Sequence, residues 1–298
     1  MWKKAVVIAL SLIPGLLTAP VLAQSPGSPG TVPVPTGEPA PWSPGTSNDS
    51  GYVGVTTDRW SATRMMLGSD LLVTSLEDSG GEGATSVRLD LYGQYMAATN
   101  AGNFGFYGTV PLSYISIFGE SESEVGNPEI GGLYAPQISG VELVLRAGIT
   151  LPVLDETSGF VSVLSGFGRL TDFTTQAPTT TLLRVSGSPM LRSGALVGRV
   201  DVGLDVPLSS DDQVNIESSA RINLAVGADL GQFVLAGELA NLVVLGEETE
   251  AIHSLGLSAH MKLGDVQPFV GLVVPVDSDL SQIINFSMAL GVRFAPAS

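Results

Sequence analysis

Residues 196–208 alternate between two kinds of position. Every second residue is aliphatic or glycine, and the charged residues Arg199, Asp201 and Asp205 all fall between them. Successive side chains of a β-strand point to opposite faces, so the stretch predicts a strand with one apolar and one charged face. The same period of two predicts further strands near 65–75, 86–98, 104–112, 129–135, 141–151, 181–190, 216–228, 233–245, 254–263, 266–276 and 284–294.

The links between these segments alternate between short links and longer, acid-rich links, as the periplasmic turns and external loops of outer-membrane barrels do. The short links lie near 98–103, 137–140, 191–194, 230–232 and 264–265. The long links lie near 119–127, 153–179, 209–215, 246–250 and 277–281. We therefore predict an all-β fold, a transmembrane antiparallel up-and-down β-barrel of about twelve strands, although ten or fourteen also fit.

Aromatic residues support the membrane assignment. In a transmembrane barrel, aromatic side chains form girdles at the two interfaces. The residues at the predicted periplasmic ends are Tyr95, Phe104, Phe106, Phe233 and Phe294.

The N-terminus has the pattern of a secretory signal peptide, with Lys3 and Lys4 before a short apolar stretch. We expect residues 1–23 to be removed by cleavage after Ala23 and the chain to reach the outer membrane. Residues 24–58, rich in Pro, Gly and Ser, are predicted to be a disordered linker, because they cannot bury enough apolar surface to offset the entropy of ordering. Residues 59–298 form the predicted barrel domain.

The composition of the chain excludes some classes of binding partner and some kinds of site. The chain carries 29 acidic and 13 basic residues, which argues against a nucleic-acid partner, because phosphate binding requires basic clusters. The absence of cysteine excludes disulfides and thiolate metal sites. No cofactor or metal is predicted. The expected partners are outer-membrane lipid, the barrel assembly machinery and a small-molecule solute.

The two histidines, His253 and His260, are the candidates for a hydrolytic site. His253 adjoins Ser254, but neighbouring strand residues point to opposite faces, so the two side chains cannot act together. His260 shares a face with Ser258 but has no orienting acid nearby in the sequence. We predict that the chain is not an enzyme.

One segment resembles a known family. The run Gly-Asn-Pro-Glu-Ile-Gly-Gly-Leu-Tyr at 126–134 is similar to the G-D-P-x-x-G-x-x-Y strand of outer-membrane barrels of the MetA-pathway of phenol degradation family. In that family the strand follows one ending in V-P, as at Val110-Pro111, and precedes one ending in L-P-T-G-D. Here Leu151-Pro152 is present, but the Thr-Gly pair is absent. The resemblance covers about residues 100–160 and a generic last strand, and it implies a barrel that takes up small, often hydrophobic compounds.

Charged side chains on the polar faces of the predicted strands should point into the barrel lumen. Either they pair across the interior and close a narrow barrel, or opposed rows of arginine and acid leave a charged aqueous constriction that selects solutes. About twelve strands lie between a filled eight-stranded barrel and an open sixteen-stranded one. The predicted lumenal charges are Arg88, Asp90, Glu142, Arg146, Arg184, Arg199, Asp201, Asp205, Arg221 and Glu238.

The longest predicted external loop, 153–179, is apolar for exposed chain. It either folds into the barrel mouth as a constriction, offers a patch to a hydrophobic ligand, packs on the rim, or extends a strand at 160–164. Its candidate gating residues are Phe160, Val163, Leu164, Phe167, Leu170 and Phe173.

Together these features predict a passive outer-membrane channel or transporter for small molecules, hydrophobic ones included, gated by the loop at 153–179. The alternative is a closed barrel that acts as a surface scaffold or adhesin without transport.

Overall fold

The computed structural model describes residues 54–76, 84–117, 120–154, 159–209, 216–246 and 249–296. The predicted signal peptide and the part of the predicted linker at 24–53 lie outside the described residues. Among the described residues, no helix is both long and apolar enough to cross a membrane.

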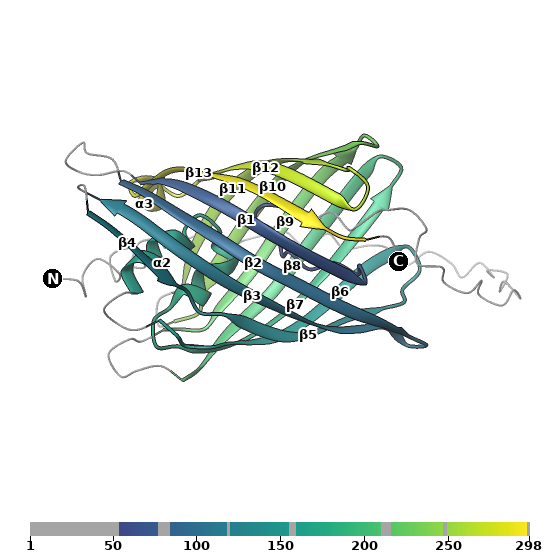
Figure 1. Cartoon of the computed structure of the whole chain (residues 1–298), viewed down its shortest axis with the longest axis horizontal. Helices are drawn as coiled ribbons and strands as arrows, with labels where there is room; N and C mark the ends of the chain where they lie inside the picture. The colour runs from purple at the N-terminus through teal and green to yellow at the C-terminus, as the bar shows by residue number, and fades with distance from the viewer. Residues whose placement is uncertain are drawn as a thin grey trace, which may run out of the picture.

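The described chain forms a barrel of tilted antiparallel strands (Figure 1). The strands are β1 (Met65–Leu76), β2 (Ala84–Thr99), β3 (Gly102–Ile117), β4 (Glu120–Val125), β5 (Glu129–Pro136), β6 (Val141–Thr150), β7 (Thr181–Ser193), β8 (Leu196–Ser209), β9 (Ser219–Asp229), β10 (Phe233–Val244), β11 (Glu250–Met261), β12 (Val266–Pro275) and β13 (Ile284–Phe294). The helical elements α2 (Gly159–Gly166), η1 (Leu170–Gln176) and α3 (Ser278–Ser281) lie in the connections.

The ring closes between its first and last strands. β1 pairs with β2 on one edge and with β13 on the other, so that Leu71 lies opposite both Leu89 and Leu290. The 13-stranded sheet includes β4, which pairs only with β3 in the described part of the chain, so the closed ring itself has twelve strands. The predicted fold class and strand number are confirmed.

The two faces of each strand form the outside and the inside of this ring. In β8, Val202 and Leu204 are exposed on the outer surface, whereas Arg199 and Asp201 are buried inside. An aliphatic outer surface suits lipid, where each backbone polar group must be paired within the protein. The ring provides this pairing because each of its strands has a neighbour on both sides.

The two ends of the barrel differ. Short turns join the strands at one end, the turn end, where Gly194 between β7 and β8 adopts a φ of 60°, a conformation that favours glycine. The long connections and the helices α2, η1 and α3 lie at the other end, the loop end (Figure 1). All five aromatic residues expected at the interface are exposed at the turn end, and Phe104 stacks on Tyr134 with ring centroids 4.2 Å apart.

One strand of the ring is interrupted, which the sequence did not predict. The acid-rich link expected at 119–127 contains β4, and β4 and β5 lie end to end along β3. Pro111 of β3 faces the break, because its C=O accepts the N–H of Gly126, and the N–H and C=O of a strand residue point to the same neighbour. Proline has no N–H, so the ladder is weakest at this point.

Candidate functional site

Residues 54–64, here called the plug segment, run through the barrel lumen and end at the turn end, where β1 begins. Residues 55–61 are each at most 2 % exposed. The composition of 24–58 predicts a disordered linker, whereas residues 54–58 are buried inside the ring, so this predicted boundary is wrong. The segment is ordered because side chains of the barrel wall pair with its backbone and its charges.

The wall accepts hydrogen bonds from the backbone of the plug segment. Glu238 of β10 accepts the N–H groups of Val55 and Thr56, at 2.9 and 2.6 Å. Asp201 of β8 accepts the N–H of Asp58 at 2.7 Å. Hydrogen bonds to a charged acceptor are stronger than neutral ones, so these carboxylates compensate well for the burial of the N–H groups.

The wall also donates hydrogen bonds to the carbonyl groups of the plug segment. Arg199 Nη2 donates to Trp60 O at 3.1 Å. Gln94 Nε2 of β2 donates to Ser61 O at 2.9 Å and to Thr63 O at 2.6 Å. The segment has no regular secondary structure, so side chains from strands far apart in the sequence satisfy its backbone.

Asp58 places its carboxylate among arginines. Its Oδ1 accepts a hydrogen bond from Arg146 Nη1 at 3.1 Å, and its Oδ2 accepts one from Ser186 Oγ at 2.9 Å. Burial by itself would raise the pKa of Asp58, but the charges of Arg146, Arg221 and Arg199 lower this pKa to about 2. Asp58 is therefore ionised at neutral pH.

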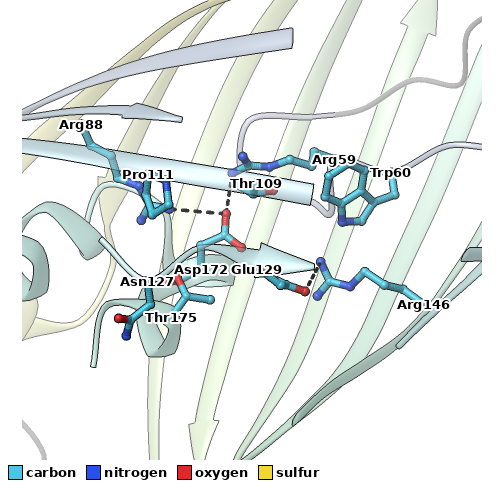
Figure 2. Close-up of a pocket in the computed structure, with 10 residues that line it drawn as sticks. All are labelled: Arg59, Trp60, Arg88, Thr109, Pro111, Asn127, Glu129, Arg146, Asp172 and Thr175. Atoms are coloured by element: carbon cyan, nitrogen blue, oxygen red, sulfur yellow. Dashed lines mark hydrogen bonds and ion pairs between the residues drawn. The ribbon is translucent and has the colours of Figure 1, made fainter. Parts of the chain in front are cut away.

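Arg59 occupies a site of opposite charge. Its Nη2 lies 2.8 Å from Asp90 of β2 and 2.5 Å from Asp172 of η1 (Figure 2). Its guanidinium also lies 4.8 Å from the ring centroid of Tyr92. Burial would lower the pKa of Arg59, but Asp172 and Asp90 raise it well above its ordinary value. One side chain of the plug segment thus bridges the wall and the loop.

Trp60 packs in an aromatic cluster. Its ring centroid lies 4.4 Å from that of Tyr107 and 6.1 Å from that of Tyr92. Met66 and Met96 belong to the same buried cluster. This cluster closes the lumen on the turn-end side of the charges.

The loop after β6 folds into the loop end of the barrel, where α2 and η1 lie within the ring (Figure 1). Val161, Phe167 and Leu170 are buried, and Leu164 and Phe173 pack against them. Their buried partners are Leu76, Ala84, Ile115, Leu242, Ile252, Leu280 and Ile284. The strand alternative for 160–164 is wrong, because these residues are helical. The side chains of Phe160 and Val163 lie outside the described part of the structure.

An ionic layer joins this loop to the wall. Arg184 of β7 is fully buried. Its guanidinium contacts Glu129 of β5 at 2.5 Å, Asp205 of β8 at 3.1 Å and Asp172 of η1 at 3.2 Å. Three carboxylates from three elements therefore share one arginine.

Arg169 links three parts of the molecule. Its Nη1 lies 3.0 Å from Asp70 Oδ2 of β1, and its Nη2 donates to Thr57 O of the plug segment at 2.6 Å. The loop, the wall and the plug segment are thus connected through buried polar contacts.

The structure places the predicted lumenal charges inside the ring. All ten are buried except Glu142, which is partly exposed. Arg88 pairs with Asp90 at 2.7 Å, and Arg221 pairs with Asp205 at 2.8 Å. In this conformation the charges pair along a strand, between neighbouring strands, and with the plug segment and η1 inside a filled lumen.

Little space remains in the ionic layer. A small cavity between the plug segment, β3, β5 and η1 has room for about one water molecule (Figure 2). Its lining residues are Arg59, Trp60, Arg88, Thr109, Pro111, Asn127, Glu129, Arg146, Asp172 and Thr175.

Several residues of this site were not predicted from the sequence. Asp70 and Arg293 are buried lumenal residues on the polar faces of predicted strands, so the alternation contained the signal for them. Asp58 and Arg59 precede the first predicted strand, and Asp172 lies in a predicted loop. Nothing in their local sequence marks these three residues as lumenal.

Asn127 connects the interrupted strand to the loop. Its Oδ1 accepts the N–H groups of Val153 and Leu154, both at 3.0 Å. Its Nδ2 donates to Ala177 O at 2.6 Å. Both ends of the loop that enters the lumen therefore meet at the break between β4 and β5.

Solved structures of similar fold are outer-membrane barrels. The COG4313 outer membrane channel from Pseudomonas putida F1 aligns with a TM-score of 0.59 at 12% identity, over 78% of this chain and 95% of that chain. The NanC porin aligns with a TM-score of 0.46 at 10% identity, over 77% and 98%. Outer membrane phospholipase A from Escherichia coli aligns with a TM-score of 0.42 at 10% identity, over 78% and 93%. No protein-family model matches the chain, and no curated protein matches it significantly. The first likeness supports the fold alone.

Proposed function

We propose that the chain is a passive outer-membrane channel or transporter for small molecules, hydrophobic compounds included, and that the described conformation is its closed state. The observation that supports this proposal is the way the lumen is filled. Two separate segments, the plug segment and the loop with α2 and η1, occupy an interior that the wall does not fill by itself. A barrel that serves only as a scaffold needs no such segments, because a barrel of about eight strands is filled by its own wall side chains.

Passage through the barrel requires both segments to move. The turn end is the periplasmic end under this proposal, so the plug segment would leave the lumen toward the periplasm. The loop would swing outward about Asn127, where its two ends are held. This movement would uncover the apolar cluster at the external end, and an aliphatic lining favours hydrophobic solutes.

We further propose a family relation and a path of export to the outer membrane for this chain. The Gly-Asn-Pro run at 126–128 lies at the break between β4 and β5, which supports a relation to the MetA-pathway of phenol degradation barrels. The signal sequence would be cleaved after Ala23. The barrel assembly machinery would then insert the barrel, and outer-membrane lipid would surround it.

We also propose that the chain has no enzymatic activity. His253 Nδ1 lies 2.7 Å from Asn241 Oδ1, and the ring of His260 stacks on Phe269 inside the lumen with centroids 5.2 Å apart. Both histidines thus have roles in hydrogen bonding and packing. Lipid hydrolysis that is lost in the variant His260→Ala would contradict this part of the proposal.

Single-channel conductance in a planar bilayer tests the channel. The variants are a deletion of 54–63, a replacement of 156–172 by a short Gly-Ser linker, and the two changes together. We expect the open probability to increase in each single variant, where only one segment still has to move, and to be highest in the double variant, where neither obstruction remains.

The fold of each variant is checked by gel mobility without heating and by circular dichroism. A folded double variant without conductance would overturn the channel and favour the closed scaffold or adhesin, which remains the second candidate because the wild-type lumen is filled.

A further inference from the structure

We infer that the lumen, once the plug segment has left it, is a binding site for an extended peptide chain that enters from the turn end. The inference rests on the proposed function, because the plug segment must leave the lumen, and it goes beyond that function by naming a further ligand class. It depends on how the wall contacts the plug segment, which is largely through the main chain.

Wall side chains contact main-chain groups along most of the plug segment. They accept from the N–H groups of residues 55, 56, 58, 61 and 62, and they donate to the carbonyl groups of residues 56, 60, 61 and 63. Every peptide carries the same groups at the same spacing. The wall residues that make these contacts are Gln94, Glu142, Arg199, Asp201, Asn223 and Glu238.

The side chains that make these contacts all belong to the barrel wall. The six side chains come from β2, β6, β8, β9 and β10, so they stay in place when the segment leaves. They would then face an open lumen with donors and acceptors in alternation. Water can solvate these groups in the open lumen; a peptide chain can replace that water along the whole set at once, whereas a small solute reaches only a few of them.

Two wall glycines make room for the side chains of Val55 and Thr56 at the same place. A Cβ at Gly271 of β12 would collide with Val55 Cγ2, and a Cβ at Gly256 of β11 would lie 3.0 Å from Thr56 Cγ2. A glycine within a strand often marks a site where a ligand approaches closely, and here the approaching groups are two side chains of the plug segment. Beside Gly256, Glu238 accepts both adjacent N–H groups of the plug segment.

Side-chain subsites add a preference to this main-chain recognition. Arg146 and Ser186 receive an acid at the position of Asp58. The carboxylate of Asp90 receives a cation at the position of Arg59. The aromatic cluster around Tyr107 receives a ring at the position of Trp60. A peptide with an acid, a base and an aromatic residue in succession should therefore bind best.

The chain offers a direct optical signal for the test. Its three tryptophans, at positions 2, 42 and 60, all precede β1. In a Trp42→Phe background, and after removal of the predicted signal peptide, Trp60 is the single tryptophan. Its emission is expected to lie at short wavelength among Tyr92, Tyr107 and the methionines and to shift to long wavelength on release into water.

The experiment uses the full chain, folded in detergent, with a specific protease site inserted between Thr63 and the exposed Arg64. Cleavage leaves the plug segment bound without a covalent link to the barrel. Synthetic peptides added in excess then compete for the lumen. The first peptide has the sequence of 54–63 with Trp60→Phe, the second has alanine in place of Asp58, Arg59 and Trp60, and the third carries N-methyl groups on Val55, Thr56 and Asp58.

We expect the first peptide to displace the plug segment and the second to do so at about 10- to 100-fold higher concentration. The third should not compete, because it lacks three main-chain donors that Glu238 and Asp201 accept. A Glu238→Ala barrel should bind the first peptide at least about tenfold more weakly. Glu217→Ala, before β9 at the loop end, serves as the matched control.

Three outcomes would overturn the inference. These are no displacement by any peptide, competition by the first peptide but not by the second at any concentration, and equal competition by the first and third peptides. The assay measures binding at equilibrium in detergent and requires no conduction. Its failure is therefore distinguishable from failure of the channel, which the bilayer recordings measure.

Discussion

The two closures of the lumen are built from different chemistry. The plug segment is held by buried charges and hydrogen bonds, with Arg59 between Asp90 and Asp172. The α2 part of the loop at the other end is held by apolar packing, in which Val161 and Leu170 are almost fully buried, whereas Arg169 and Asp172 join the same loop to the ionic layer. The ionic closure fixes one register, because a shift of one residue would separate each buried charge from its partner. The apolar closure is non-directional and tolerates small shifts.

This difference predicts how each closure responds to substitution. Loss of one partner of a buried ion pair leaves the other charge uncompensated, so the cost is large. Loss of apolar atoms costs their transfer free energy and the energy of the cavity, and so it increases with the volume removed. Single substitutions should therefore disturb the ionic layer most.

The largest effect is expected for Arg184→Ala. The substitution removes the arginine that Glu129, Asp172 and Asp205 share. We expect the free energy of unfolding, measured by urea titration in detergent, to fall by about 3–5 kcal/mol.

Arg192→Ala is the matched control for this experiment. Arg192 pairs with Asp229 at the turn end, where both side chains are partly exposed and 3.4 Å apart. The expected loss in the free energy of unfolding is below about 1 kcal/mol. Equal losses in the two variants would show that the lumenal charges are solvated, contrary to the closed ionic layer.

Leu170→Ala tests the apolar closure with the next largest effect. Leu170 is buried in the cluster that holds the loop, so its truncation should cost about 3 kcal/mol and increase the open probability in a bilayer. Leu255→Ala is the control, because Leu255 is exposed on the outer surface. The loss of stability in Leu170→Ala should be the same between pH 7 and pH 3. A loss that changes with pH would contradict the assignment of this closure to apolar packing.

The outer wall was predictable because each strand carries its own signal. The alternation at 196–208 identified both the extent of β8 and the side of it that faces outward. Even the less regular first strand, expected at 65–75, is β1. A period of two is a local property of the sequence, and one closed sheet uses it in every strand.

The interior could not be predicted to the same depth, because its contacts are not local. The position of Arg184 within its strand predicts that it points inward, but its partner Glu129 lies 55 residues away in the sequence. β4 was missed because alternating glutamates suggested a solvated loop. The composition of 24–58 concealed Asp58, whose order depends on charges supplied by the wall.

Acid should weaken the ionic closure and leave the apolar one unchanged. The pKa of Asp58 is lowered from an ordinary 3.8 to about 2 in the closed state, so its contribution to closure is complete above about pH 4 and is lost as the pH falls toward 2. This difference corresponds to about 2 kcal/mol. Open probability recorded from pH 7 down to pH 3 should be constant at first and rise below about pH 4. Asp58→Asn should reduce the rise, and an unchanged rise in this variant would assign it to Asp90 and Asp172, which pair with Arg59 of the plug segment.

The smallest expected effects come from one substitution made in both closures. Ser186 Oγ donates to the charged Asp58 at 2.9 Å, whereas Ser165 Oγ of α2 donates to Ser162 O at 2.8 Å and accepts from the neutral Ser113 at 2.7 Å. Ser186→Ala removes one hydrogen bond to a charged group and Ser165→Ala removes two neutral ones, so each should cost about 1.5 kcal/mol.

The coupling of each serine to Asp58 distinguishes the two serines more clearly than the loss of stability in the single variants. In an Asp58→Asn background the cost of Ser186→Ala should fall to that of a neutral hydrogen bond, because the charged acceptor is gone. The cost of Ser165→Ala should not change in this background, since its partners, Ser113 Oγ and Ser162 O, are neutral and are not hydrogen-bonded to Asp58. Urea titrations of the two double-mutant cycles measure these coupling energies. A coupling of Asp58 to Ser165 as strong as its coupling to Ser186 would mean that the two closures act as one unit.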